Sequence, residues 1–347
     1  MIKKRLESID FLRTIAIIIM LTANSAPYVL NATHPLWFRL ICSLAAPLFI
    51  FLSGFSFYIS FKKHQNYWLK IKLSIYLLLS AIFVDVFVWR ILPFQTFDVL
   101  YLIAFGQAIN IILFRLKLPV KIFITLICIA LSPILVANFG YRFSNTDVNL
   151  FSLSSSGNNL SSIFQFSRLF IDGWFPLLPW LAFSIIGSVS AELYDKISNN
   201  IKLVKWLSFS LFACGVFALF SQNIIQEERE DYLELFYPPT ILFLLIAITF
   251  IFTAYAFSIK INSLLNSKLK YLSVLGRHSL FTYILHTFVI SYIFKSYFVP
   301  SGYLKFTILI LAFVSFCFCL TTLLEYINKK KYLQSIPFIL KAILGLN

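Results

Sequence analysis

Long apolar stretches recur along almost the whole chain, and short segments that carry charge separate them. A helix needs about 20 predominantly apolar residues to cross the hydrocarbon core of a bilayer. The pattern therefore predicts an all-α integral membrane protein with about ten transmembrane helices in one polytopic domain over residues 1–347. The predicted spans cover residues 10–30, 38–61, 73–92, 97–114, 122–139, 173–193, 206–222, 238–258, 272–294 and 306–327.

Basic residues indicate which side of the membrane each gap between spans faces. They concentrate in the even-numbered gaps and at both termini, as in the runs Lys3–Arg5 and Lys329–Lys331, and they are scarce in the odd-numbered gaps. Cytoplasmic loops of membrane proteins carry such an excess of lysine and arginine. We therefore predict that both termini lie in the cytoplasm.

Composition supports the membrane interpretation and excludes other classes. Hydrophobic residues make up 60% of the chain and charged residues 12%, with a mean hydropathy of +0.86, whereas soluble domains carry roughly 25% charged residues. The net charge is +15, but the basic residues are divided among the gaps, so we predict no nucleic-acid partner. The high lysine, isoleucine and phenylalanine content favours a bacterial gene and hence the cytoplasmic (inner) membrane.

Two further sequence features narrow the picture. No small-residue cleavage motif follows the first apolar run, so we interpret that run as a span and not as a signal peptide. The five cysteines all lie in apolar runs without a CxxC motif, which predicts neither a metal site nor a disulfide framework.

The first span contains polar residues where polarity is costly. An ionisable group within a span costs about 2.5–3.5 kcal/mol on insertion scales, so it usually faces protein and often has a function. Successive residues of a helix turn by about 100°, which places Asp10 and Arg13 roughly 60° apart, and Arg13 and Asn24 roughly 20° apart. All three side chains therefore project from one face. The alternative for the charged pair is a salt bridge that fixes packing.

Two histidines are candidates for chemistry. His34 lies in the first predicted outer loop, where a neutral imidazole can take a proton from an amine or hydroxyl or can itself attack a thioester; the alternative is an exposed, inert side chain. In the ninth span, Ser279, Tyr283 and His286 form a polar stripe at helical spacing, and His286 alternatively hydrogen-bonds across helices. Arg277, at the cytoplasmic end of this stripe, binds phosphate or marks the membrane interface.

A third group of ionisable residues lies within or beside the other spans. It comprises Asp85, Arg90, Asp98 and Glu192. Asp85 and Arg90 are close enough in sequence to pair across a turn, or each pairs with another span.

An ordered set of short motifs runs through nearly the whole chain. It consists of RLESIDFLRTIAIIIMLTANS, HPLW, AAPLFIFLSG, FDVLYLIA at 97–104, FPLLPW at 175–180, YPPT at 237–240 and LGRHSLFTYILH at 275–286. This set resembles the membrane acetyltransferases related to heparan-α-glucosaminide N-acetyltransferase. The resemblance implies a helix bundle with cytoplasmic entry of acetyl-CoA, a catalytic histidine at His34 and an assisting asparagine at Asn24. It also allows a homodimer.

The chain departs from the family pattern at two positions. Thr14 stands where the family commonly has glycine after the first-span arginine, and Leu44 stands where better-known members have an aspartate. These departures leave the acceptor open. The broader membrane acyltransferase family three begins with a similar segment, but its catalytic histidine falls at about Asn24, so its chemistry does not carry over unchanged.

Together these observations predict an acyltransferase that binds acetyl-CoA or another acyl-CoA as co-substrate. The expected donor-binding residues are Arg13, Asp10 and Arg277, and the expected catalytic residues are His34 and Asn24, with His286 as a second choice. The expected acceptor is a sugar amine or hydroxyl of an extracytoplasmic glycan, such as a glucosamine, within a surround of membrane lipids. A transporter or flippase of a small molecule or lipid-linked sugar is the alternative, and it would require no CoA. A non-catalytic scaffold is disfavoured by the cost of keeping these polar groups in spans.

Overall fold

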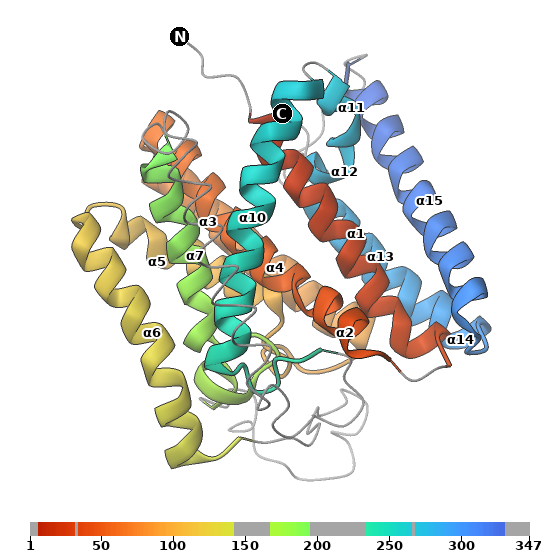
Figure 1. Ribbon diagram of the computed structural model, residues 1–347, viewed down its shortest axis with the longest axis horizontal. Coiled ribbons are helices and arrows are strands. Elements are labelled where there is room, and N and C mark those ends of the chain that lie inside the picture. Colours follow the sequence, from red (N-terminus) through yellow and green to blue (C-terminus); the bar gives the residue numbers. More distant parts are fainter. Residues whose placement is uncertain (1–5, 32–33, 142–166, 195–233, 266–267, 330–347) are drawn as a thin grey trace. The chain divides into compact units, whose positions relative to one another are not determined.

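A computed structural model of the chain describes residues 6–31, 34–141, 167–194, 234–265 and 268–329 (Figure 1). Regular structure in these ranges is helical, apart from one backbone bridge between Leu30 and Ser301. The all-α fold class is therefore confirmed for the described residues. The chain divides into two compact units, of which unit 1 comprises Met1–Ala45 and Phe252–Asn347 and unit 2 comprises Ala46–Ile251. The prediction of a single domain stays a prediction.

The helices follow the predicted apolar runs. Unit 1 contains α1 (Glu7–Val29), α2 (Leu36–Ser43), α11 (Leu269–Leu272), α12 (Val274–Arg277), α13 (Ser279–Val289), the π-helix η6 (Ile290–Phe294), α14 (Lys295–Tyr297) and α15 (Tyr303–Lys329). Unit 2 contains nearly all of α3 (Ala45–His64), α4 (Tyr67–Phe83), the π-helix η1 (Val84–Trp89), α5 (Val99–Leu113), α6 (Leu118–Phe139), the π-helix η4 (Arg168–Asp172) and α7 (Leu177–Glu192). The helix α10 (Ile241–Leu265) contributes residues to both units.

Six helical segments of the described ranges are long and apolar enough to cross a membrane. They are Glu7–Val29, Leu36–His64, Tyr67–Trp89, Leu118–Phe139, Ile241–Leu265 and Tyr303–Asn328, and two shorter apolar helices are Val99–Leu113 and Leu177–Glu192. These segments make the chain an integral membrane protein. The predicted span at 206–222 lies outside the described residues. The total of about ten spans and the cytoplasmic location of the termini stay predictions.

The predicted ninth span, residues 272–294, is interrupted where it meets α1. The backbone leaves helical geometry at Ser273 and at His278, so α12 is a separate turn. Between these points the N–H of Gly276 donates to the hydroxyl oxygen of Thr14 in α1 over 3.0 Å. A side chain at Gly276 would place its Cβ 1.9 Å from the carbonyl oxygen of Asp10. The break and the missing side chain together let α12 touch the α1 backbone.

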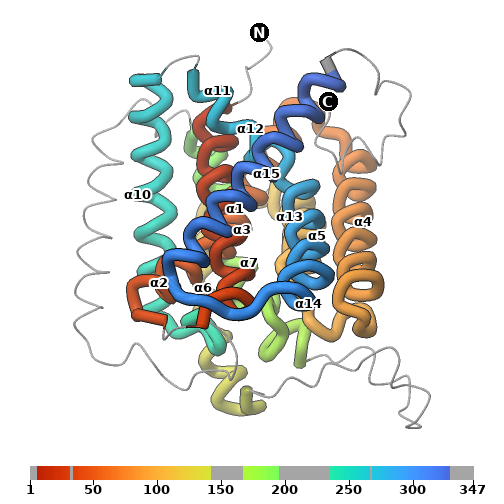
Figure 2. The backbone as a smooth tube through the Cα atoms, turned by 90° about the vertical axis from the view of Figure 1, so that its right-hand side faces the viewer, coloured from red at the N-terminus to blue at the C-terminus, as the bar shows by residue number. Residues whose placement is uncertain are grey.

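Helix α1 is the centre of unit 1. It packs against α11, α12, α13, η6 and α15, and also against α2, which follows it in the chain (Figure 2). Because neighbours lie on several sides, residues around most of its circumference are buried, including Leu12, Ile17 and Leu21. Polar side chains on α1 must therefore find partners within the protein.

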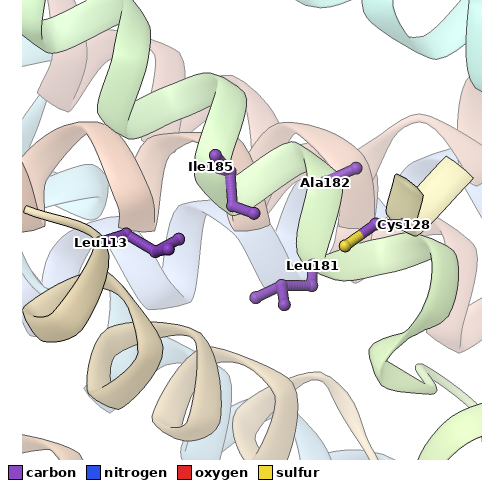
Figure 3. Packing of buried hydrophobic residues seen from close by; sticks show 5 residues of the cluster. All are labelled: Leu113, Cys128, Leu181, Ala182 and Ile185. Atoms are coloured by element: carbon purple, nitrogen blue, oxygen red, sulfur yellow. The ribbon is translucent and has the colours of Figure 1, made fainter. Parts of the chain in front are cut away.

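Unit 2 is held together by small residues and a compact apolar cluster. A Cβ on Gly54 of α3 would lie 1.9 Å from the carbonyl oxygen of Ser184 in α7, and one on Gly187 would lie 2.0 Å from that of Phe51. Such small residues let membrane helices approach closely. On its other side α7 packs against α5 and α6 (Figure 3), through Leu113, Cys128, Leu181, Ala182 and Ile185.

The buried carboxylate of Asp85 is satisfied by hydroxyl groups. It accepts hydrogen bonds from the hydroxyl of Tyr101 over 2.6 Å and from that of Thr96 over 3.1 Å. Asp98 caps the start of α5, where its side chain accepts a hydrogen bond from the N–H of Val99. The sequence did not determine which groups pair with Asp85, and the structure shows that two hydroxyls of unit 2 do so.

Candidate active site

A polar contact joins α1 to α13 within unit 1. Nδ2 of Asn24 lies 2.9 Å from Nε2 of His286. His286 is fully buried and Asn24 is half-buried. The ring of Tyr283, on the same buried face of α13, packs edge-on against the His286 ring at a centroid distance of 4.9 Å. Two of the residues singled out in different parts of the sequence are therefore direct partners.

The second ring nitrogen of His286 fixes the direction of this hydrogen bond. Nδ1 of His286 is hydrogen-bonded to the carbonyl oxygen of Tyr283. Because a carbonyl oxygen can only accept, Nδ1 carries the hydrogen, and Nε2 of the neutral ring is an acceptor. Asn24 therefore donates one N–H to Nε2. The other N–H and the carbonyl oxygen of the Asn24 amide make no further hydrogen bond among the described residues, so a ligand can bind them.

The end of α1, which leads toward His34, is hydrogen-bonded to Ser301, just before α15. The N–H of Asn31 donates to the carbonyl oxygen of Ser301 over 3.0 Å, and the N–H of Ser301 donates to the carbonyl oxygen of Val29 over 2.8 Å. These two bonds form the backbone bridge between Leu30 and Ser301. They hold the end of α1 and Asn31 against the segment that precedes α15.

Aromatic packing fixes the other end of the same loop. The ring of Phe38, in the first turn of α2, makes edge-to-face contacts with Tyr303 and Phe306 of α15. The imidazole of His34 lies against Phe38 at a centroid distance of 5.9 Å. The predicted catalytic residue His34 thus packs against the first turn of α2 in unit 1.

The surroundings of His34 keep its imidazole neutral. The side chain is half-buried. Burial, and secondarily the positive charge of Arg39, hold the pKa of His34 below its ordinary value. Its Nδ1 atom is shielded from solvent and has no hydrogen-bond partner within the described part of the chain. These surroundings therefore favour the neutral form of the His34 imidazole. No hydrogen bond between the described residues joins His34 to Asn24.

Asp10 and Arg13 form an ion pair on the same helix. Nη1 of Arg13 lies 3.0 Å from Oδ1 of Asp10, and the Arg13 side chain stays 19% exposed whereas that of Asp10 is 4% exposed. At about 1.5 Å per residue, Asp10 is roughly 21 Å along the helix from Asn24. The predicted polar face of α1 therefore carries the Asp10–Arg13 ion pair near the start of the helix and the Asn24 amide near its end.

The side chain of Arg277 is bonded to groups of α11 and α15 and to Ser273. Its Nε lies 2.5 Å from Oε1 of Glu325 in α15, and Nη1 donates to the carbonyl oxygen of Lys270 and to the hydroxyl of Ser273, each over 2.8 Å. His278 also faces Glu325, with Nε2 3.6 Å from the carboxylate. The structure places Arg277 in this separate cluster and not with the Asn24 contact.

The family described as heparan-alpha-glucosaminide N-acetyltransferase, catalytic, matches residues 5–218, which is well over half of the chain. The chain belongs to this family. The resemblance drawn from the motifs is thereby confirmed. Membership of the heparan-alpha-glucosaminide N-acetyltransferase family makes the chain a membrane acyltransferase. No match was found among curated proteins.

The extent of the family match separates the candidate residues into two groups. Asp10, Arg13, Asn24 and His34 lie inside the part that matches the heparan-alpha-glucosaminide N-acetyltransferase family, whereas His286 lies beyond it. The link between Asn24 and His286 therefore comes from the structure. Within the described ranges, no group of histidine, cysteine, aspartate and glutamate side chains is arranged to hold a metal ion.

Sequence reasoning missed two partners in this region. Glu325 is a lone acid in the last predicted span, and the cost of a buried charge would have marked it as the partner of a base. Thr14 was noted only as a departure from the family glycine, although its hydroxyl bonds both Gly276 and the carbonyl oxygen of Asp10. The contact between α1 and α12 gives the Thr14 hydroxyl these two partners, which explains why threonine is accommodated at position 14.

Proposed function

We propose that this protein transfers an acetyl group, or another acyl group, from cytoplasmic acyl-CoA to a sugar amine or hydroxyl of an extracytoplasmic glycan. Family membership supports acyl transfer across a membrane. The observation that carries the proposal is the Asn24 amide, which His286 holds on α1 in the same unit as the neutral base His34. We place the protein in the bacterial cytoplasmic membrane, which it crosses several times and where lipids surround it. A homodimer is compatible with this proposal.

In the proposed acyl transfer, His34 and Asn24 have separate roles. His34 takes the proton from the acceptor amine or hydroxyl, and the acceptor attacks the carbonyl carbon of the thioester. The free N–H of Asn24 donates to the oxyanion that forms, as donors of an oxyanion hole do. Collapse of the tetrahedral intermediate expels the CoA thiolate, which takes up a proton. In the alternative sequence, His34 first attacks the carbonyl carbon of the thioester, and the CoA thiolate leaves. The acceptor then attacks the acyl-imidazole and gives up its proton, and His34 is released.

His286 takes a different role from the other two residues. Both of its ring nitrogens are already hydrogen-bonded and the side chain is fully buried. It therefore acts as a positioning residue that fixes the amide of Asn24 and does not itself exchange protons with a substrate.

The donor phosphates are assigned to Arg13, with Asp10 orienting its guanidinium. An arginine can bind a phosphate through two parallel hydrogen bonds, and Arg13 retains partial exposure. Arg277 is comparably exposed, and Glu325 opposes its charge as Asp10 opposes that of Arg13. Arg13→Ala and Arg277→Ala are therefore each expected to weaken acetyl-CoA binding.

The test is the transfer of labelled acetyl groups from acetyl-CoA to glucosamine by the purified full-length protein. His34→Ala is expected to lose transfer by about 100-fold or more, as removal of a general base typically does. His64→Ala is the matched control, because His64 is an exposed histidine at the end of α3. Wild-type transfer by folded His34→Ala protein would refute the assignment. Substrate translocation without any CoA requirement would favour the transporter.

A further inference from the structure

Basic residues gather at one end of unit 2. The short turns between α3 and α4 and between α5 and α6 lie at this end, together with the end of α7. Four cations lie in or next to the two turns, namely Lys62, Lys70, Arg115 and Lys121. The positive-inside pattern assigns this end to the cytoplasm.

A continuous set of aromatic rings supports the four cations. The ring of Phe61 packs against Phe57, Tyr67 and Phe114 at centroid distances of 5.4, 4.9 and 4.7 Å, and Tyr58 packs against Phe114 at 5.2 Å. Each cation lies over one of these rings, with Lys62 5.9 Å and Lys121 5.6 Å from Tyr58, Lys70 5.1 Å from Phe57 and Arg115 5.1 Å from Tyr67. Cation–π contacts of this kind hold basic side chains in place, so the positive groups form one fixed cluster, called the basic cluster below.

Two lysines of the basic cluster are buried, and they differ in their partners. Lys121 is 1% exposed and its ammonium lies 2.6 Å from the carboxylate of Glu192. Lys70 is 7% exposed, but within the described ranges its ammonium is hydrogen-bonded only to the hydroxyl of Ser60, and no carboxylate there pairs with it. An ammonium has three N–H donors, so Lys70 has donors to spare.

This difference points to an absent anion. A buried charge is costly unless it is paired and hydrogen-bonded. The fold supplies Glu192 for Lys121, and it supplies no corresponding group for Lys70 among the described residues. The exposed Lys62 and Arg115 add positive charge to the same end. Counted over the described residues, the basic cluster therefore has a surplus of positive charge that a multiply charged anion would balance.

We propose that the basic cluster is a binding site for the phosphate groups of an anionic ligand, with Lys70 as its central contact. Two sources share this chemistry at the predicted cytoplasmic surface. One is the phosphate-bearing part of CoA, in which case the inference rests on the proposed function and the cluster binds the donor. The other is the headgroup of an anionic lipid, which basic residues at that leaflet attract.

The experiment measures how ligands shift the thermal midpoint of the detergent-purified full-length protein. The probes are CoA, inorganic pyrophosphate, phosphatidylglycerol and, as a zwitterionic control, phosphatidylcholine. A ligand that binds only the folded state raises the midpoint. Lys70→Met replaces the buried ammonium with an apolar side chain of similar length. Lys72→Met is the matched control, because Lys72 is exposed on the same helix and its loss changes the net charge equally.

The site predicts that Lys70→Met weakens binding of the phosphate ligand about tenfold or more, since hydrogen bonds to charged groups are the strong ones. Lys72→Met is expected to bind like the wild type. Without ligand, the midpoint of Lys70→Met should equal or exceed that of the wild type, because a buried unpaired charge has been removed. A lower midpoint without ligand would show a structural role for Lys70 and overturn the proposal.

The remaining outcomes identify the source or reject the site. A CoA or pyrophosphate shift that depends on Lys70 identifies the donor phosphates, and a shift that only phosphatidylglycerol produces identifies a lipid headgroup. No shift with any phosphate probe, or equal losses in both variants, overturns the proposal. Because pyrophosphate and lipid binding need no acyl transfer, loss of the proposed function and loss of this site are separate results.

Discussion

Replacing His286 with leucine is expected to release the amide of Asn24. In the wild type, Nε2 of His286 accepts a hydrogen from Asn24, and the Nδ1–H of His286 is held by the carbonyl oxygen of Tyr283. Leucine fills similar space but accepts no hydrogen bond, so the amide can rotate away from the position in which its second N–H meets the oxyanion. Glutamine at position 286 keeps an acceptor oxygen and is expected to preserve the orientation.

The size of the effect follows from the contact that is lost. Leaving a buried polar group without its hydrogen-bond partner costs about 1–3 kcal/mol. If that energy holds the amide in its productive orientation, kcat falls by roughly 5- to 150-fold in His286→Leu. The KM for acetyl-CoA is expected to change little, because the amide acts on the oxyanion and not on the bound ground state. His286→Gln is expected to stay within a few-fold of the wild type.

The assay is the initial rate of acetyl transfer in a double-mutant cycle with Asn24→Ala. Since His286 acts through Asn24, the double variant should be no slower than Asn24→Ala alone. The acid limb of the pH profile should not move in His286→Leu, because His34 is the base. The reasoning would be refuted if His286→Leu lowered kcat by the same factor in the wild-type and the Asn24→Ala background. Loss of the acid limb of the pH profile in His286→Leu would refute it as well.

Two further predictions concern the same unit. Burial and the charge of Arg39 lower the pKa of His34, and protonated His34 cannot act as a base, so kcat/KM should fall as the pH drops through that pKa; Arg39→Gln should move this acid limb to higher pH, and a limb that stays in place would contradict the electrostatic argument. Gly276→Ala should destabilise the protein by about 1–3 kcal/mol or more, because its Cβ would overlap the carbonyl oxygen of Asp10. Gly302→Ala is the control in the same thermal unfolding measurement, since its Cβ meets nothing within 4 Å, and equal midpoints for the two variants would refute the packing argument.

The sequence by itself determined the class of protein and most of the described helices. A bilayer demands long apolar helices, so each run of suitable length was visible locally, as in α1 and α15. The family was also readable from ordered motifs, because they are short and lie within single segments. The cost of polarity in a span drew attention to Asp10, Arg13 and Asn24 before any neighbour was known.

Only the tertiary structure decided which of these polar groups meet. Asn24 and His286 are 262 positions apart, and their contact depends on how α1 and α13 are rotated against each other. Helical periodicity gives the face on which a side chain lies, but it does not give the helix that this face touches. For the same reason Arg277, predicted to bind phosphate, was found with Glu325. The break beside Gly276 could not be read from hydropathy either, because it occurs where the Gly276 N–H donates a hydrogen bond to Thr14 of another helix.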